Sequence, residues 1–280
     1  MNNRRDDHRA AIPSLDGAFS RDTVSMDLTM CGLLVDKAEE MARLYATHRD
    51  WTTVEDRWFD ERRDGRSTRG SSRKVYRVLS SRFKTADRKL PAITQLPSVF
   101  KQCETTRDKA QVLYFYLVEE DPLVQYAIHT YINRLLEDGI EALQFDQESI
   151  EAILNGFSYA DGGEFDYAAS TTVRWGEGFR GVLREIGVIE SQQALGGQVP
   201  TIGTIPLLVA SGYSWEQDGE EWLTQPLGWL YLFQQHPYWE SLAERLSQHP
   251  SWDASGLHGE IKLQPVGDTY GWADVSEVEK

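Results

Sequence analysis

Residues 110–117 carry the mostly apolar sequence Ala-Gln-Val-Leu-Tyr-Phe-Tyr-Leu, and a second apolar segment follows directly after Asp121 and Pro122. In that second segment apolar residues recur at spacings of three and four as far as Leu136, which predicts an amphipathic helix. Proline is favourable in the first turn of a helix, and Gly139 marks its end. We expect these two consecutive helices to form the hydrophobic core of a mainly α-helical protein.

The bulk composition is that of a folded globular protein. The chain has 280 residues, of which 40% are hydrophobic and 26% are charged. No segment reaches the roughly 18 consecutive apolar residues that a membrane span needs. Residues 1–9 are polar and lead into no apolar run, so they do not resemble a secretory signal. We expect a soluble protein of the cytoplasm with no membrane partner.

A helix-turn-helix unit is predicted upstream of this core. Apolar residues between positions 28 and 44 recur at helical spacing, and a second helix is expected at 51–59. Residues 63–70 contain two glycines and predict a turn, and the following helix, 71–84, is amphipathic and basic. A helix, a glycine-bearing turn and a basic helix in this order are typical of a DNA-binding helix-turn-helix.

A second unit downstream has the outline of a winged helix. Residues 170–186 predict a helix that Gly187 ends. Residues 188–190 suit a short strand, and the adjacent glycines at 196–197 predict the tip of a β-hairpin that returns through 199–205. The expected fold is therefore mainly α: a helical bundle with an N-terminal helix-turn-helix and a second, winged-helix-like unit with a short β-hairpin.

Composition and periodicity divide the chain into six regions. They are a disordered tail (1–24), the helix-turn-helix region (25–95), a helical core (96–160), the winged-helix-like unit (161–205), a tryptophan-rich helical region (206–266) and an acidic tail (267–280). The first tail is polar and lacks periodicity, as disordered segments do. The last is acidic, and we expect it to be loose.

The net charge of -15 hides a basic segment. Residues 57–89 contain twelve basic and four acidic residues and so carry +8, which leaves -23 on the rest of the chain. From residue 191 to the end there are twelve acidic and three basic residues. A local positive field on an acidic body is the electrostatic footprint that we expect for nucleic-acid binding.

Arginine outnumbers lysine, with eight lysines among the 29 basic residues. Together with the excess of acidic residues, this suggests a halophilic prokaryote whose proteins are adapted to high salt. A GC-rich genome would favour arginine over lysine in the same way, so both explanations stay open.

The residues expected to contact DNA lie on the two basic helices and on the turn before the first. Phosphate binding needs arginine and lysine on one exposed surface, and base contacts come from the first turns of a helix in the major groove. The candidates are Arg66, Arg69, Ser71, Arg73, Lys74, Arg77, Arg82 and Lys84 in the first unit, and Thr172, Arg174, Arg180 and Arg184 in the second. A plainer interpretation is that the basic face is solvated and pairs with the acidic body.

No set of residues predicts catalysis or a bound metal. The two cysteines, Cys31 and Cys103, belong to no CxxC or Cys/His pattern, and none of the six histidines lies in HExxH or at another close metal spacing. The chain has neither a Walker A motif nor a GxSxG motif. We expect a non-enzymatic protein without cofactor or metal.

Residues 176–181 match the GxGxxG string of dinucleotide-binding proteins, but we reject this interpretation. The fingerprint has to follow a buried strand and open a helix, and here the helical pattern already runs through the glycines. Each glycine inside a helix is unfavourable by roughly 1 kcal/mol, so we expect close packing against another element to explain them.

The chain resembles the BrxA family, small proteins encoded in BREX phage-defence operons. The likeness covers about residues 26–265 and is carried by four passages. They are Cys31-Gly32-Leu33-Leu34, the turn and basic helix from Gly65 to Phe83, residues 113–117 with 121–124, and the passage from Ser170 to Glu190. None of them is a catalytic motif. The chain departs from the family's pattern in its N-terminal tail, its tryptophan-rich C-terminal part and its acidity.

This resemblance implies a mainly helical protein with helix-turn-helix or winged-helix features and a NusB-like helical portion. It also implies DNA binding without enzymatic activity, in defence against viruses. We therefore expect double-stranded DNA as the partner, with other BREX operon proteins as further candidates. Two alternatives stay open. One is an adaptor whose basic helix docks an acidic protein and whose tryptophans serve as anchors; the other is an RNA-binding protein.

Overall fold

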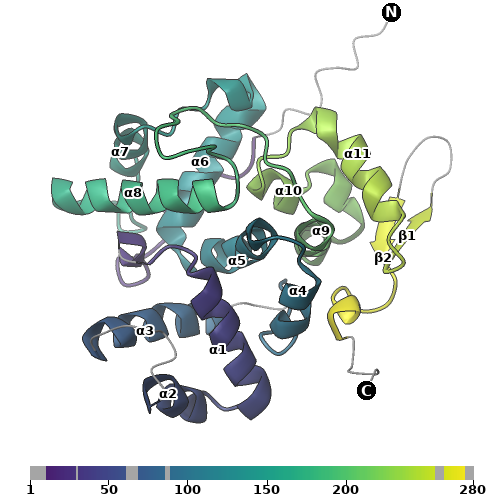
Figure 1. The fold of residues 1–280 in the computed structure, drawn as a ribbon. Helices are drawn as coiled ribbons and strands as arrows, with labels where there is room; N and C mark the ends of the chain where they lie inside the picture. Colours follow the sequence, from purple (N-terminus) through teal and green to yellow (C-terminus); the bar gives the residue numbers. More distant parts are fainter. Residues whose placement is uncertain (1–10, 30, 61–68, 86–88, 256–261, 275–280) are drawn as a thin grey trace, which may run out of the picture.

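The computed structural model describes residues 11–29, 31–60, 69–85, 89–255 and 262–274 (Figure 1). Helices make up 63% of the described residues, which form eleven α-helices and one small antiparallel sheet. The prediction of a mainly α-helical fold with a short β-hairpin is confirmed, although the hairpin lies near the C-terminus and not in the predicted winged-helix-like unit. None of the described helices combines the length and the apolar character that crossing a membrane requires.

Short connections join most of the elements along the chain. The α-helices are α1 (Val35–His48), α2 (Trp51–Asp60), α3 (Arg69–Thr85), α4 (Leu96–Gln102), α5 (Thr106–Glu120), α6 (Pro122–Asp138), α7 (Gln147–Asn155), α8 (Ala169–Glu185), α9 (Thr204–Asp218), α10 (Leu227–Tyr231) and α11 (His236–Ser247). The 3-10 helices and strands are η1 (Asp27–Thr29), η2 (Ile140–Ala142), η3 (Gly219–Thr224), β1 (Trp252–Ser255), β2 (Lys262–Pro265) and η4 (Gly271–Asp274).

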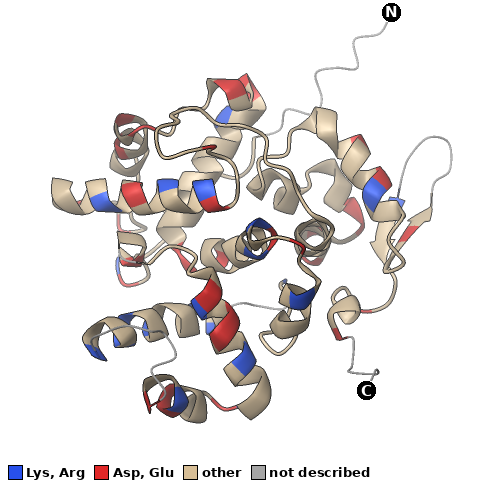
Figure 2. Ribbon diagram, viewed as in Figure 1, with Lys and Arg blue, Asp and Glu red and all other residues tan. Residues whose placement is uncertain are grey.

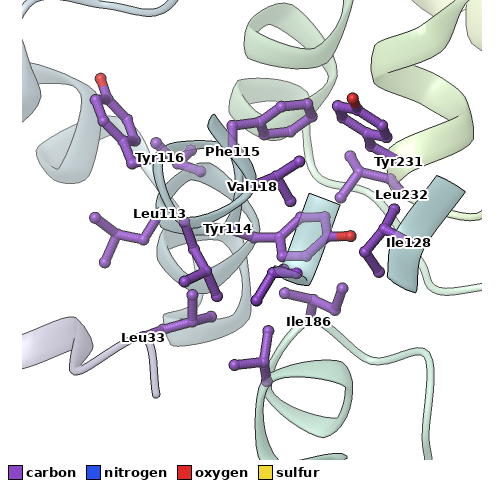
Figure 3. Packing of buried hydrophobic residues seen from close by; sticks show 14 of the residues in the cluster. Leu33, Leu113, Tyr114, Phe115, Tyr116, Val118, Ile128, Ile186, Tyr231 and Leu232 are labelled. Atoms are coloured by element: carbon purple, nitrogen blue, oxygen red, sulfur yellow. The ribbon is translucent and has the colours of Figure 1, made fainter. Parts of the chain in front are cut away.

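Helix α5 lies at the centre of the fold. Every residue from Ala110 to Val118 is buried, so this helix is covered on all sides. Its neighbours are α1, α3, α6, α8 and α9, which come from distant parts of the chain. Figure 3 shows Leu33, Ile186 and Tyr231 among the side chains packed around it. Burial on every face explains why this segment is almost continuously apolar rather than periodic.

A defined break separates the two core helices. Asp121 is the N-cap of α6, and its carboxylate accepts hydrogen bonds from the N–H groups of Leu123 (3.0 Å) and Val124 (3.2 Å). Pro122 occupies the first turn, where its missing N–H removes no helical hydrogen bond. Gly139 follows the last residue with a φ of 83°. The helix predicted from these three signals is confirmed.

Helices α1, α2 and α3 pack against one another beside α5 (Figure 1). Arg49 ends α1, and the Asp50 carboxylate then accepts hydrogen bonds from the N–H (2.8 Å) and the hydroxyl (2.7 Å) of Thr53. Helices α2 and α3 stand where the sequence predicts the two helices of the helix-turn-helix. The connection between them, residues 61–68, lies outside the described residues. Its eight residues exceed the three or four that are typical of this motif.

The segment before α1 packs against the body of the protein, so the prediction of a disordered tail is wrong for residues 11–24. Ile12 and Val24 are buried. The N–H of Ile12 donates to Oδ1 of Asn133 (2.8 Å), and its carbonyl accepts from Nδ2 of the same side chain (3.2 Å). The two residues are 121 positions apart, a distance that local composition cannot reveal. Residues 1–10 lie outside the described part of the chain.

The predicted wing after α8 is not a β-hairpin. Gly196 forms an isolated antiparallel bridge with Gln144 instead, and the Leu195 carbonyl accepts a hydrogen bond from the N–H of Phe145 (2.7 Å). A Cβ on Gly197 would lie 2.8 Å from the Phe145 ring, so this glycine permits close packing. One backbone hydrogen bond joins the N–H of Gln198 to the Val188 carbonyl (2.9 Å), but no strand forms on either side of these glycines, so the prediction of strands there is wrong.

The β-hairpin lies near the C-terminus. Strands β1 and β2 pair antiparallel with Trp252 opposite Pro265. Trp252 packs on Trp222 of η3 with ring centroids 5.5 Å apart, and the Trp222 indole donates to the Leu263 carbonyl (2.9 Å).

The segment after the hairpin also packs against the core, so the prediction of a loose tail is wrong for residues 267–274. Tyr270 is buried, and its hydroxyl donates a hydrogen bond to the carbonyl of Lys89. Ala273 of η4 is buried as well. Residues 275–280 lie outside the described part of the chain.

Candidate nucleic-acid interface

The apolar face of α3 holds this helix in place. Val75, Val78 and Leu79 are buried, and Phe83 meets Tyr116 of α5 with ring centroids 5.5 Å apart. Close packing of this kind fixes the rotation of a helix about its own axis. The opposite face of α3 is therefore presented to solvent in a defined direction.

That opposite face is exposed and basic. With 3.6 residues per turn, Arg69, Arg73, Arg77 and Lys84 fall within an arc of about 80°, and Lys74 lies about 60° beyond it. All five are exposed, and α3 contains no acidic residue. In Figure 2 the charged residues of α3 are all basic, whereas α1 and α2 carry both signs. We call these five residues the basic face of α3.

Two residues of the basic face have partners that orient them. The Arg77 guanidinium forms an ion pair with the Asp27 carboxylate of η1, and its side chain remains 64% exposed. The Lys84 ammonium lies 4.8 Å from the centre of the Trp51 ring, a cation–π geometry. Sequence reasoning missed both partners. Asp27 lies 50 positions before Arg77, so no periodicity within one helix could indicate it.

Arg82 does not belong to this face, so the prediction that it contacts DNA is wrong. Its side chain is buried and donates hydrogen bonds to the carbonyls of Gly32 (2.7 Å) and Cys31 (3.2 Å). Burial lowers the pKa of the guanidinium, and the carboxylates of Glu120 and Asp121 oppose that effect. Arg82 is therefore a structural cation that ties the segment before α1 to α3.

The two remaining candidates of the first unit are not on the exposed arc. Ser71 lies in the first turn of α3 and is partly buried. Arg66 lies outside the described residues.

The four candidates on α8 divide into two pairs. Arg174 and Arg184 are exposed, but the exposed acids Glu177 and Glu185 share the helix with them (Figure 2). Thr172 is buried, and its hydroxyl is 3.5 Å from a backbone carbonyl of the preceding turn. Helix α8 therefore has no continuous basic face, and the prediction that Thr172 contacts DNA is wrong.

Arg180 holds the loop that follows α8. Its Nη1 donates to the Phe145 carbonyl (2.8 Å), and its Nη2 donates to the carbonyls of Gln192 (2.9 Å) and Ala194 (3.0 Å). The carbonyls of Gln192 and Ala194 belong to the region where the sequence predicts a β-hairpin, and the guanidinium supplies hydrogen bonds that a strand partner would otherwise give. These three hydrogen bonds give Arg180 a structural role, and its contact with DNA stays a prediction.

The glycines at 176–181 lie inside α8, and one of them lets η1 come close. A Cβ on Gly178 would fall 2.2 Å from the carbonyl oxygen of Leu28. The predicted packing role is thus confirmed for this glycine. Since η1 also carries Asp27, the partner of Arg77, it lies between α3 and α8.

Cys103 and His129 belong to residue types that often serve catalysis, and neither side chain is fully exposed. Within the described ranges, no group of three or more histidine, cysteine, aspartate or glutamate side chains is placed to hold a metal ion. Burial raises the pKa of the Cys103 thiol to about 12, which disfavours the reactive thiolate at neutral pH. The His129 ring lies 3.0 Å from the Pro13 carbonyl and 2.9 Å from the Tyr231 hydroxyl, inside the core.

The chain matches no protein-family model, and comparisons with curated proteins and with solved structures gave no match. The resemblance to the BrxA family therefore stays a prediction. The function has to be argued from the geometry of α3.

Proposed function

We propose that this protein binds double-stranded DNA through the basic face of α3, as a non-enzymatic accessory protein. The supporting observation is a helix buried on one side and exposed on the other, with five exposed cations and no carboxylate among its residues. At 1.5 Å per residue, the 17 residues of α3 span about 26 Å. An α-helix fits the major groove of B-DNA, which is about 12 Å wide.

The positions of the cations suit contacts with both bases and phosphates. Arg69, Arg73 and Lys74 lie in the first two turns, from which recognition helices reach base edges. Arg77 and Lys84 continue along the helix toward its C-terminal end, at positions suited to the phosphate backbone. Arginine can bind a guanine edge or a phosphate through two parallel hydrogen bonds, a geometry that lysine lacks.

The charge of the remaining chain favours one orientation of the duplex. The basic segment carries +8 and the rest of the chain -23, so the acidic body repels DNA while α3 attracts it. Salt weakens both effects, because the Debye length falls from about 10 Å at 0.1 M to about 3 Å at 1 M. Duplex affinity should therefore decrease steeply as salt rises.

The resemblance to the BrxA family supports a role for this binding in anti-phage defence, beside other products of a BREX operon. That part of the proposal rests on the sequence passages alone.

An adaptor anchored by the tryptophan-rich region is a weaker alternative, because several of its tryptophans serve the core. Trp222, Trp229 and Trp252 are buried, and the Trp229 indole donates to the Ser211 hydroxyl (2.9 Å). RNA binding remains an alternative use of the same basic face. A matched RNA hairpin separates it from duplex binding.

Fluorescence anisotropy with a labelled duplex of about 25 base pairs tests the proposal, with an RNA hairpin of equal length as competitor. The variant Arg73→Glu, Lys74→Glu, Arg77→Glu should lose at least about 100-fold in duplex affinity, since each reversal replaces an attraction with a repulsion. The RNA hairpin should compete poorly if the duplex is the true ligand.

A matched control makes the same change of net charge on exposed residues of α4, α6 and β2: Lys101→Glu, Arg134→Glu, Lys262→Glu. It should keep most of the affinity. If both triple variants lost the same duplex affinity, the loss would follow from the change in net charge alone, and the assignment of the binding site to α3 would be contradicted. Stronger binding of the hairpin would move the proposal to RNA.

A further inference from the structure

A cavity of about 560 Å³ lies where the start of α1, the first turn of α5 and the end of α8 meet. This volume is within the range of roughly 300–1,000 Å³ that is typical of small-molecule sites. Leu34, Val35 and Ala110 form its apolar wall. No residue of the basic face of α3 lines it, so DNA binding makes no use of this cavity.

Charged side chains of both signs line the same cavity. Arg107 of α5 lies against the turn after α8, since a Cβ on Gly187 would be 3.1 Å from its Nε. Glu185 of α8 lies against the segment before α1, with Oε1 3.7 Å from the place of a Cβ on Gly32. Among the described residues, neither side chain forms an ion pair within 4.0 Å. Asp36 and Lys37 of α1 also line the cavity, so it presents two cations and two anions.

Helix α1 starts at this cavity with a first turn that no side chain caps. Its N-cap is Leu34, which has a left-handed φ of 56° and no acceptor in its side chain. The Leu34 carbonyl accepts hydrogen bonds from the N–H groups of Lys37 and Ala38, both at 2.9 Å. The N–H groups of Val35 and Asp36 have no acceptor among the described residues. They are additional donors beside the charged pair.

We propose that this cavity binds a small zwitterion, an α-amino acid with an apolar side chain. The carboxylate pairs with Arg107, the ammonium pairs with Glu185, and the side chain packs on Leu34, Val35 and Ala110. A ligand with both charges can pair with Arg107 and Glu185 at once, whereas a ligand with a single charge can pair with only one of them. The cavity should therefore select for both charges on one ligand.

Isothermal titration of the full chain with L-leucine tests the charge requirement. N-acetyl-L-leucine lacks the ammonium and L-leucinamide lacks the carboxylate, so each should bind at least about tenfold more weakly than L-leucine. Equal affinities for the three compounds, or no binding of L-leucine, would overturn the proposal.

Two variants test the site itself. Arg107→Gln and Glu185→Gln should each weaken L-leucine binding about tenfold. Lys101→Gln, an exposed cation of α4 outside the cavity, should leave it unchanged. Thermal unfolding checks that the variants fold, which we expect because both side chains are exposed. Unchanged affinity in both variants would mean that L-leucine binds elsewhere and would overturn the assignment. The titration contains no nucleic acid, so its result does not depend on whether the DNA-binding proposal is correct.

Discussion

Helices α3 and α8 are both 17 residues long, amphipathic and rich in arginine, yet they use their arginines differently. On α3, Arg73 and Arg77 are exposed with further cations, and no residue of the helix is acidic. On α8, Arg180 is bound to three backbone carbonyls, and acids share the exposed surface with the other arginines. Helical spacing tells which face a residue occupies. It does not tell whether a neighbouring loop needs that cation for its own hydrogen bonds.

The largest effect is expected from the buried cation of α3. Arg82→Ala removes the donors to two backbone carbonyls and leaves Glu120 and Asp121 without their opposing charge. Loss of this buried cation leaves the groups around it uncompensated, which should lower the free energy of unfolding by about 3–5 kcal/mol. Urea unfolding of the wild type and of Arg82→Ala measures this change in the free energy of unfolding. Arg73→Ala on the exposed face of the same helix should change this free energy by less than about 0.5 kcal/mol. Similar values for both variants would contradict the distinction.

The second largest effect is expected on α8, where an arginine bonded to backbone carbonyls can again be compared with an exposed arginine of the same helix. Arg180→Ala leaves three carbonyls without their donor and should lower the free energy of unfolding by about 2–3 kcal/mol. Arg174→Ala removes an exposed arginine from the same helix and should be nearly neutral. If Arg180→Ala weakened duplex binding without loss of stability, Arg180 would be a contact residue after all.

Asp121 makes the buried side of α3 sensitive to pH. Burial raises the pKa of its carboxyl to about 7, although hydrogen bonds from the N–H groups of Val124 and Leu123 and the charge of Arg82 lower it. In the unfolded chain an aspartate has a pKa of about 3.9. The folded state thus binds the proton more tightly, and its stability falls as pH rises from about 4 to about 7.

Asp121→Asn isolates this contribution, because asparagine keeps an acceptor for the N-cap and does not titrate. Between pH 5 and pH 8, the stability of the wild type relative to this variant should fall by roughly 2 kcal/mol. Urea unfolding at both pH values measures the difference. Parallel pH profiles for the two proteins would contradict the raised pKa.

The smallest effect concerns the partner of Arg77. Asp27→Asn removes a carboxylate that competes with phosphate for the guanidinium and should raise duplex affinity by up to about 1 kcal/mol. Asp161→Asn is the control, because Asp161 pairs with Arg21 away from α3. Unchanged anisotropy in the Asp27 variant would mean that Arg77 does not contact the duplex.

Signals between neighbouring residues were sufficient to predict the helices of the core and the basic face of α3. The Asp121-Pro122 start and the Gly139 end of α6 are properties of adjacent residues, so the sequence predicts them well. The same spacing rule could also have removed Arg82 from the candidates. Arg82 lies seven positions after the buried Val75, which is two turns of helix, and therefore on the apolar face.

The remaining errors involve partners that are distant in the sequence. The polar composition of residues 1–24 predicts a disordered tail, yet the N–H of Ile12 forms a hydrogen bond with Asn133, which lies 121 positions away in the sequence. The glycines at 196–197 resemble a hairpin tip, yet Gly196 pairs with Gln144 of an earlier segment. Backbone groups in loops take whatever donors the tertiary structure brings near, and no local pattern encodes that choice.

The salt dependence of duplex binding tests the central claim most directly, when it is measured for the wild type and for one double variant of each helix. Each phosphate contact contributes about -0.9 to the slope of log affinity against log salt. Arg73→Ala, Arg77→Ala on α3 should reduce the magnitude of that slope by about 1.8, and Arg174→Ala, Arg184→Ala on α8 should leave it unchanged. An unchanged slope for the α3 variant, or an equal reduction for the α8 variant, would contradict the account.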